Sequence, residues 1–154
     1  MFHNRMMRGV LAIALGAGAL GATALGVTGV GESTVASAST PPLICHKIFG
    51  HITTTVDIAK CGVAQKGAHF AGADILTGGT LTWGKSRATT SYTGTATSPG
   101  EGSCGAGKVE YDFTGTVTAD TSTYVTVGDT VTYDVCVDTT TNVVHIVKRT
   151  TASF

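Results

Sequence analysis

Apolar and polar residues alternate along two stretches of the chain, residues 108–118 and 130–138. The apolar positions are Val109, Tyr111, Phe113 and Val117, in phase with Gly115, and then Val131, Tyr133, Val135 and Val137. Successive side chains of a β-strand point to opposite faces of the sheet, so an apolar period of two predicts a half-buried strand in each stretch. Cys136 is out of phase with the apolar positions, as expected for a bridge to a loop outside the core.

Further strands are predicted where threonine, valine and isoleucine are concentrated. These stretches are residues 43–48, 52–59, 80–83, 89–97, 123–127 and 143–148, with glycine-rich turns between several of them. No stretch after residue 38 shows a helical period. Many short strands without helices predict an all-β domain, either a small antiparallel β-sandwich of the immunoglobulin-like kind, which we favour, or a partly open barrel. Trp83, the one tryptophan, is expected in the core.

A short motif occurs twice in the predicted strands. Residues 92–97 read Tyr-Thr-Gly-Thr-Ala-Thr, and residues 113–118 read Phe-Thr-Gly-Thr-Val-Thr. We interpret both copies as strands in which the aromatic residue packs inward and the glycine lets the sheet bend or a neighbouring side chain approach, with a β-bulge at each glycine.

The first 38 residues have the organisation of a signal peptide. Arg5 and Arg8 precede an uncharged apolar run at residues 9–30, and Ala36-Ser37-Ala38 forms a small-x-small cleavage site. We expect cleavage after Ala38, which leaves residues 39–154 as one domain. An uncleaved run of this length would be a membrane anchor, but the cleavage motif that follows it favours release of a secreted, extracellular protein.

Four cysteines lie after the predicted cleavage site, at Cys45, Cys61, Cys104 and Cys136. An even number in a small exported domain predicts two disulfide bonds, and four cysteines allow three connectivities. We favour Cys45 with Cys61 and Cys104 with Cys136, because each pair brackets a predicted strand. None of the cysteines has the close spacing of a zinc site.

The charges after residue 38 nearly balance, and nothing resembles the basic footprint of a nucleic-acid-binding protein. Their distribution is uneven. Seven carboxylates lie between Glu101 and Asp138, where Lys108 is the single base, so we expect a mildly acidic face.

Three groups of residues could carry chemistry, and each has a simpler interpretation. A nucleophile would need one of His46, His51, His69 and His145 as its base, but no Gly-x-Ser-x-Gly motif is present. His46 and His51 flank a predicted turn at Gly50 and could share a metal with His69, or they are surface histidines. Glu110 and Asp112 share one strand face and could act as the carboxylate pair of an inverting glycosidase, and Asp112, Asp134 and Asp138 could hold calcium. Such carboxylates, however, usually keep one face of a strand solvated. We expect no catalytic residue, no metal and no cofactor.

Three segments carry a resemblance to known proteins. Residues 79–84, 89–94 and 113–120 resemble small exported β proteins of actinobacteria, and this likeness implies a compartment and an architecture. The size and the two bridges are similar to those of the secreted subtilisin inhibitors of the same bacteria, in which the loop after a cysteine contacts the protease. That loop would here be Gly105-Ala106-Gly107-Lys108, but it is rich in glycine, and those inhibitors have helices that this pattern lacks. The size, bridges and composition are also similar to the immunoglobulin-like apoproteins that carry enediynes.

The sequence therefore predicts a secreted, non-catalytic domain that binds an extracellular protein or small ligand, or is associated with the cell envelope. The alternative is a serine-protease inhibitor that acts through the loop from Cys104 to Lys108, with Gly105 and Lys108 as contact residues. No nucleic-acid partner and no stable membrane anchor are expected.

The signal peptide and the two bridges can be tested together by intact mass. We expect the exported protein to have the mass of residues 39–154 and to gain no alkyl groups when treated with iodoacetamide without a reductant. Reduction before alkylation is the control, and it should add four groups, one for each of the four cysteines. A mass that includes the apolar run, or thiols that react without reduction, would contradict the prediction.

Overall fold

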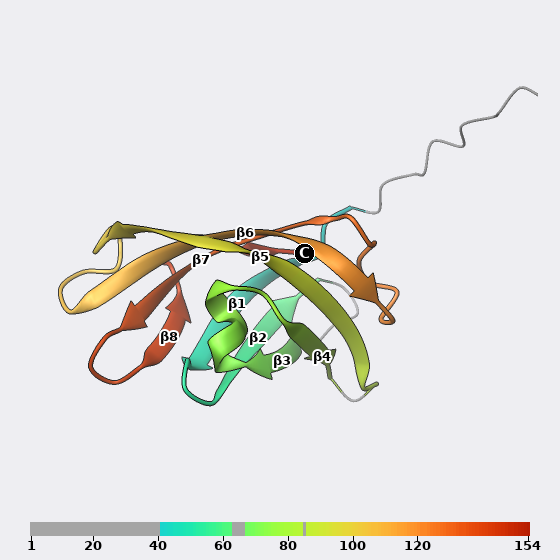
Figure 1. Cartoon of the computed structure of the whole chain (residues 1–154), viewed down its shortest axis with the longest axis horizontal. Coiled ribbons are helices and arrows are strands. Elements are labelled where there is room, and N and C mark those ends of the chain that lie inside the picture. The colour runs from blue at the N-terminus through green and yellow to red at the C-terminus, as the bar shows by residue number, and fades with distance from the viewer. Residues whose placement is uncertain (1–40, 63–66, 85) are drawn as a thin grey trace, which may run out of the picture. The chain divides into compact units, whose positions relative to one another are not determined.

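A computed structural model describes residues 41–62, 67–84 and 86–154 (Figure 1). The predicted signal peptide and its cleavage site lie outside the described residues. Within the described residues, no helix is both long and apolar enough to cross a membrane.

The domain is all-β, as predicted. Its strands are β1 (Ile44–His51), β2 (Thr55–Cys61), β3 (Gly67–Ala71), β4 (Thr80–Trp83), β5 (Ala88–Gly100), β6 (Lys108–Asp120), β7 (Thr130–Asp138), β8 (Val143–Ile146) and β9 (Ala152–Ser153). One short 3₁₀ helix, η1 (Gly72–Leu76), follows β3. The bounds of β4 and β7 agree with the predicted stretches. The elements β3, η1 and β9 were not predicted, because they are short and carry no clear alternation of apolar and polar residues.

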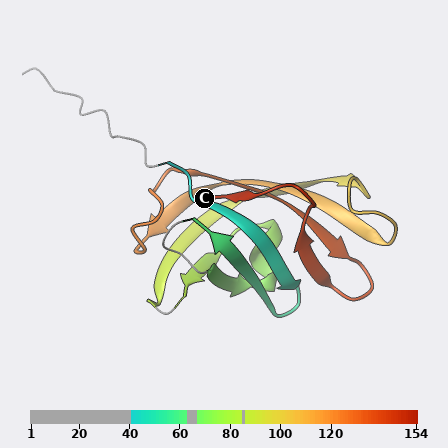
Figure 2. The same ribbon diagram turned by 180° about the vertical axis from the view of Figure 1, so that it is seen from behind.

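The strands form an antiparallel barrel that closes on β1. Each of the strands from β1 to β8 pairs with the next, and β1 also pairs with β8, which completes a ring of eight strands. The short strand β9 pairs with both β1 and β7. Figure 1 shows the long strands β5, β6 and β7 along one side and β1 to β4 on the other, with η1 beside the latter, and Figure 2 shows β1 and β2 from behind.

Aromatic side chains fill the space inside the strands. The buried rings are Phe70, Trp83, Tyr92, Phe113, Tyr133 and Phe154. Phe113 and Tyr133 stack with centroids 4.5 Å apart, and the C-terminal Phe154 lies within 6.4 Å of three other rings. Such ring pairs stabilise a core beyond the area that they bury. Trp83 is completely buried, as predicted.

The polar ends of these rings have hydrogen-bond partners inside the core. The Tyr133 hydroxyl donates to the carbonyl oxygen of Ile75 in η1 at 2.8 Å and lies 3.4 Å from the Tyr92 hydroxyl. Burial raises the pKa of both tyrosines, so both are neutral. Trp83 Nε1 donates to Thr90 Oγ1 at 2.7 Å, and this hydroxyl donates to Asp120. These bonds connect η1 and β4 to the long strands.

The two copies of the repeated motif are paired strands. Gly94 of β5 lies directly opposite Gly115 of β6 without a change of register, so the predicted bulge at each glycine is wrong. The register shifts of this pair lie instead between Ser91 and Tyr92 and between Thr97 and Gly100. A Cβ on Gly94 would lie 2.6 Å from Phe113 Cζ, because the Phe113 ring covers both glycines. Glycine is therefore required here by the close approach of a ring and not by a bulge.

The predicted strand at residues 123–127 is also wrong, because these residues form a loop. Thr123 has a left-handed backbone, with φ 64°. Its N–H donates to Asp120 Oδ2 at 2.8 Å, and Ser122 Oγ donates to Asp120 Oδ1 at 2.6 Å. A carboxylate that accepts local hydrogen bonds stabilises a turn at the expense of the strand.

The contact between Phe113 and the glycine pair predicts the effect of Gly94→Ala. The added methyl group would overlap the Thr114 carbonyl group and the Phe113 ring, so the free energy of unfolding should fall by about 1–3 kcal/mol. Urea denaturation measures this change. Thr95→Ala, at the exposed neighbouring position, is the control and should change stability by less than about 0.5 kcal/mol. Equal stability of the Gly94 variant and the native protein would contradict the packing described here.

Candidate functional site

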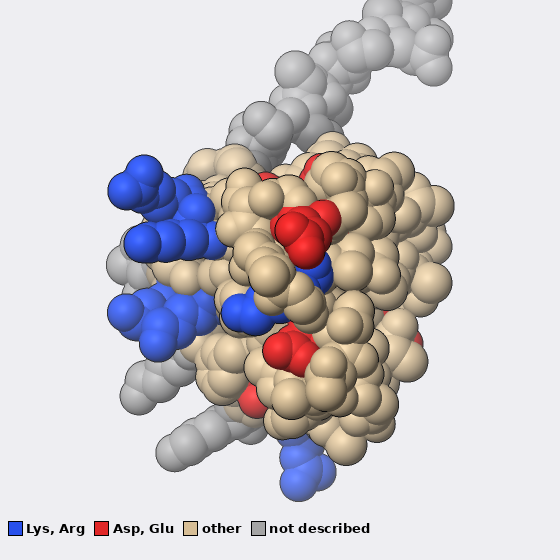
Figure 3. Space-filling view, turned by 90° about the vertical axis from the view of Figure 1, so that its left-hand side faces the viewer, with Lys and Arg blue, Asp and Glu red and all other residues tan. Residues whose placement is uncertain are grey.

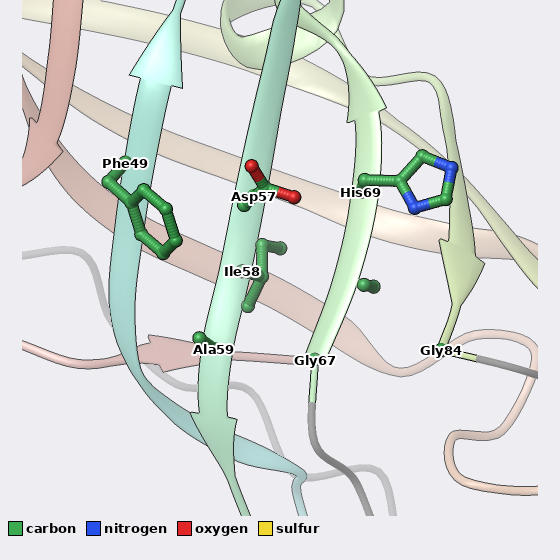
Figure 4. A pocket seen from close by; sticks show the side chains of 8 residues that line it. Phe49, Asp57, Ile58, Ala59, Gly67, His69 and Gly84 are labelled. Carbon is green, nitrogen blue, oxygen red and sulfur yellow. The ribbon is translucent and has the colours of Figure 1, made fainter.

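A hollow of about 290 Å³ lies on the outside of the barrel, over β1, β2 and β3 (Figure 4). Its lining residues are Phe49, Asp57, Ile58, Ala59, Gly67, Ala68, His69 and Gly84. Because the core fills the inside of the strands, this concave surface is the best candidate binding site among the described residues.

Strand register creates the hollow. Phe49 of β1 lies opposite Asp57 of β2, and Asp57 lies opposite His69 of β3. In a neighbouring row on the same strands, Ala59 lies opposite Gly67. The Phe49 and His69 side chains therefore stand beside Ala59 and Gly67, which have a very small side chain or none, and this difference leaves a depression over β2 and β3. Lys47 faces Ala59 at the β1 end of the second row.

Gly67 forms part of the floor because only glycine fits there. Its φ is 147°, and a Cβ at this position would overlap the Ile58 carbonyl oxygen and approach Ala59. The absent side chain lets β3 approach β2 closely and leaves the space above Gly67 open.

The side chains around the hollow offer three kinds of contact. Phe49 is 47% exposed, although it is a large apolar residue. In Figure 4, the Phe49 ring lies on one side of Asp57 and the His69 ring points away from Asp57, toward β4. A ligand would thus meet an aromatic face, a hydrogen-bond acceptor and an imidazole. Because the imidazole points away from the carboxylate, the two do not form a catalytic pair in this geometry.

The histidines predicted as possible metal ligands do not form a metal site. His46 and His51 both belong to β1, and the chain turns after them at residues 52–54, so the predicted turn at Gly50 is wrong. His69 lies in β3, in a separate row from His46. Over the described ranges, no group of three His, Cys, Asp or Glu side chains is placed to hold a metal ion.

The expected acidic face exists on β6 and β7. Asp112 lies directly opposite Asp134, and Glu110 lies in a neighbouring pair of the same strands. Burial raises the pKa of the Asp134 carboxyl, and the charges of Asp112 and Glu110 raise it further. The proposed calcium ligands Asp112, Asp134 and Asp138 do not form a group that could hold a metal in this part of the chain.

Asp138 and His145 have pKa shifts of their own. Asp138 accepts hydrogen bonds from the backbone N–H groups of Thr140 and Thr141, at 3.0 and 2.8 Å. Both hydrogen bonds lower the pKa of Asp138, and the one from Thr141 has the larger effect. Burial and the nearby Lys108 lower the pKa of His145. Each shift has a local structural cause, and neither group lies at the hollow.

The loop between Cys104 and Lys108 is a compact turn. The Lys108 N–H donates to the Gly105 carbonyl oxygen at 3.3 Å, and Gly105 and Gly107 have φ of 84° and 77°. The Ser103 N–H donates to Glu110, which attaches the loop to β6. Lys108 begins β6 opposite Asp138 and is half-buried, so Gly105 and Lys108 do not lie together on an extended segment.

The two disulfides have the expected connectivity. Cys45–Cys61 joins facing positions on β1 and β2, and Cys104–Cys136 joins the loop to β7. Each bridge is expected to stabilise the fold by roughly 2–4 kcal/mol. The first bridge lies on the two strands that form one side of the hollow, so it also limits their relative movement.

Comparison with protein-family models, with curated proteins and with solved structures finds no match for this chain. The site must therefore be interpreted from its own geometry.

The sequence singled out His69 as a possible base or metal ligand, but no local pattern placed it beside Phe49 or Asp57. Phe49 and Asp57 were not predicted as site residues, because their position at the hollow depends on the pairing of β1, β2 and β3. The small residues Ala59 and Gly67 could be recognised as a floor only after the register of three strands was known.

The repulsion at Asp134 predicts how stability depends on pH. Because the folded pKa lies above the ordinary value of 3.8, the folded state binds the proton more tightly, and native stability is lost as pH rises through the folded pKa. Asp134→Asn should remove this loss and raise the free energy of unfolding at pH 7 by up to about 0.5 kcal/mol, since the site is partly exposed. Urea denaturation as a function of pH measures the change.

The control is Asp138→Asn, for which the expected change in the free energy of unfolding at pH 7 has the opposite sign. The folded pKa of Asp138 is lowered, so its stabilisation is present above the unfolded pKa and lost as pH falls through the folded pKa. Its replacement should lower stability at pH 7. If both variants changed stability in the same direction, the electrostatic interpretation would be rejected.

Proposed function

We propose that the protein is an exported, non-catalytic binding domain that receives its ligand in the hollow over β1, β2 and β3. The observation that carries this proposal is the exposed Phe49 ring beside a floor of very small residues on a disulfide-bonded sheet. Export is supported by the predicted signal peptide, and the two disulfides are compatible with an extracellular protein.

An outer binding site agrees with the way the interior is packed. We propose that the closed ring is flattened, so that β5 to β7 and β1 to β4 pack as two layers, as in a sandwich. The aromatic rings between the layers occupy the space in which a wider barrel would hold a ligand. A ligand would therefore be held on the outside, where Phe49 is accessible.

The chemistry of the hollow fits one ring of a carbohydrate. The apolar face of a pyranose would stack on Phe49, while its hydroxyl groups would exchange hydrogen bonds with Asp57 and His69. The small side chains of Ala59 and Gly67 leave room for the ring. A shallow and preformed surface of this kind costs little reorganisation on binding.

Binding is favoured over hydrolysis because of the number of carboxylates. Glycosidases ordinarily place two carboxyl groups on either side of the bond that they cleave, and among the described residues that line the hollow Asp57 is the single carboxylate. Protease inhibition through Lys108 has weaker support, because the loop that carries it is a compact turn.

The proposal is tested by two variants of the mature protein with its disulfides intact. Phe49→Ala removes the stacking surface, and Ala59→Phe fills the hollow. Soluble gluco-, xylo-, chito- and galacturono-oligosaccharides would be titrated while backbone amide signals are recorded by NMR. We expect one class of sugar to shift the signals of β1, β2 and β3, and both variants to weaken its binding at least about tenfold, from the loss of one buried aromatic contact.

Val127→Ala is the matched control, because it removes an exposed apolar side chain that does not line the hollow. It should bind like the native protein. Native-like binding by both hollow variants would refute this proposal, as would ligand-induced shifts confined to other strands or the absence of binding to every sugar.

A further inference from the structure

The basic side chains of the domain gather beside the hollow. Of the six Lys and Arg residues that the structure describes, four lie on β1, on β2 or in the turn between β8 and β9. We call these four residues, Lys47, Lys60, Lys148 and Arg149, the basic patch. All four are exposed. Figure 3 shows several blue side chains along one edge of the molecule, and further blue side chains near red ones toward the centre of the view.

Strand register brings the members of the patch together. Cys45 faces Cys61 and Lys47 faces Ala59, so Lys60 lies between these two facing pairs on β2, next to β1. The Thr150 N–H donates to the Val147 carbonyl oxygen at 3.2 Å and closes a turn whose central residues are Lys148 and Arg149. Two residues further on, Ala152 pairs with Cys45, so this turn lies beside the first half of β1.

The patch and the hollow are continuous on the sheet. Lys47 is opposite Ala59, and Ala59 lines the floor of the hollow and is followed by Lys60. Lys47 lies two residues from Phe49 on β1, and Lys60 lies three residues from Asp57, which faces Phe49 on β2. The carboxylates of β6 and β7 lie on other strands than Lys47 and Lys60, while Lys148 and Arg149 follow Val147, whose N–H donates to the backbone carbonyl oxygen of Asp134 on β7 at 2.9 Å.

We propose that the ligand of the hollow is an anionic polysaccharide, whose chain continues from the hollow onto the basic patch. This inference rests on the proposed function and adds the charge of the ligand to it. One sugar ring stacks on Phe49, and carboxylate, sulfate or phosphate groups on neighbouring sugars pair with the patch. Exposed ion pairs are individually weak, so several of them along one polymer chain provide the affinity together.

An anionic membrane surface is the less favoured partner. Phe49 would have to enter the lipid for membrane binding, but Asp57 faces it in the adjacent strand, and a carboxylate is repelled by an anionic surface and costly to bury in lipid. A sugar hydroxyl, in contrast, is a suitable donor for Asp57. The same pair of residues thus favours a hydroxylated, charged chain.

The experiment compares polymers that differ in charge, and variants that lose positive charge at different positions. Polygalacturonate and dextran sulfate are the anionic probes, and methyl-esterified polygalacturonate and dextran are their neutral counterparts. The two double variants are Lys47→Gln with Lys60→Gln, and Lys148→Gln with Arg149→Gln. Arg87→Gln is the matched control, because Arg87 is also exposed and, like Arg149, has a positive φ, but lies outside the patch.

We expect at least one anionic polymer to bind and its neutral counterpart to bind much more weakly. Loss of one exposed ion pair lowers affinity by about threefold, so each double variant should weaken binding roughly tenfold, while Arg87→Gln should have little effect. Added salt should weaken binding of the anionic polymer through screening. Circular dichroism should show all variants folded, since every substituted side chain is exposed.

The possible failures are distinguishable. Equal binding of charged and neutral polymers, with no effect of the double variants, would overturn the inference and leave the binding function of the hollow intact. Normal binding by Phe49→Ala and Ala59→Phe, with loss in the double variants, would overturn the proposed hollow function and with it the continuous site. An effect of Arg87→Gln as large as that of the double variants would show unspecific attraction and overturn the inference. Binding to phosphatidylglycerol vesicles without binding to either anionic polymer would overturn it in favour of a membrane.

Discussion

The whole structure depends on the double pairing of β1. This strand forms hydrogen bonds with β2 on one side and with β8 and β9 on the other, and it thereby closes the sheet around its aromatic core. Closure leaves no unpaired edge in the ring, which removes a common route to aggregation of β proteins. It also fixes the register between β1 and β2, on which both the hollow and the basic patch depend.

The packed aromatic core holds the strands of this closed arrangement in place. Phe113, Tyr133 and Phe154 fill the interior, while Gly94 and Gly115 allow the Phe113 ring to lie close to two backbones. No buried polar side-chain atom among the described residues lacks a hydrogen-bond partner. A satisfied and densely packed interior supports an outer surface that need not change shape when a ligand binds.

The division of charge gives the domain two different faces. Asp112 and Asp134 lie opposite each other on β6 and β7, and their repulsion costs stability that the core can offset. Lys47 and Lys60 lie on β1 and β2, beside the hollow. An anionic polymer would be attracted to one face and repelled from the other, so the separation of charge would orient the domain on its ligand.

The sequence by itself determined the all-β class of the domain, because local patterns are enough for this. Alternation in residues 108–118 and 130–138 predicted the central strands, the even number of cysteines predicted two bridges, and Trp83 was correctly expected in the core. Local chemistry also misled: residues 123–127 are rich in β-formers, but Asp120 holds them in a loop. Only the tertiary structure decided the closure of the ring and the position of the hollow. Phe49, Ala59 and Gly67 belong to three different strands, and their juxtaposition depends on register, which the pattern along one strand does not contain.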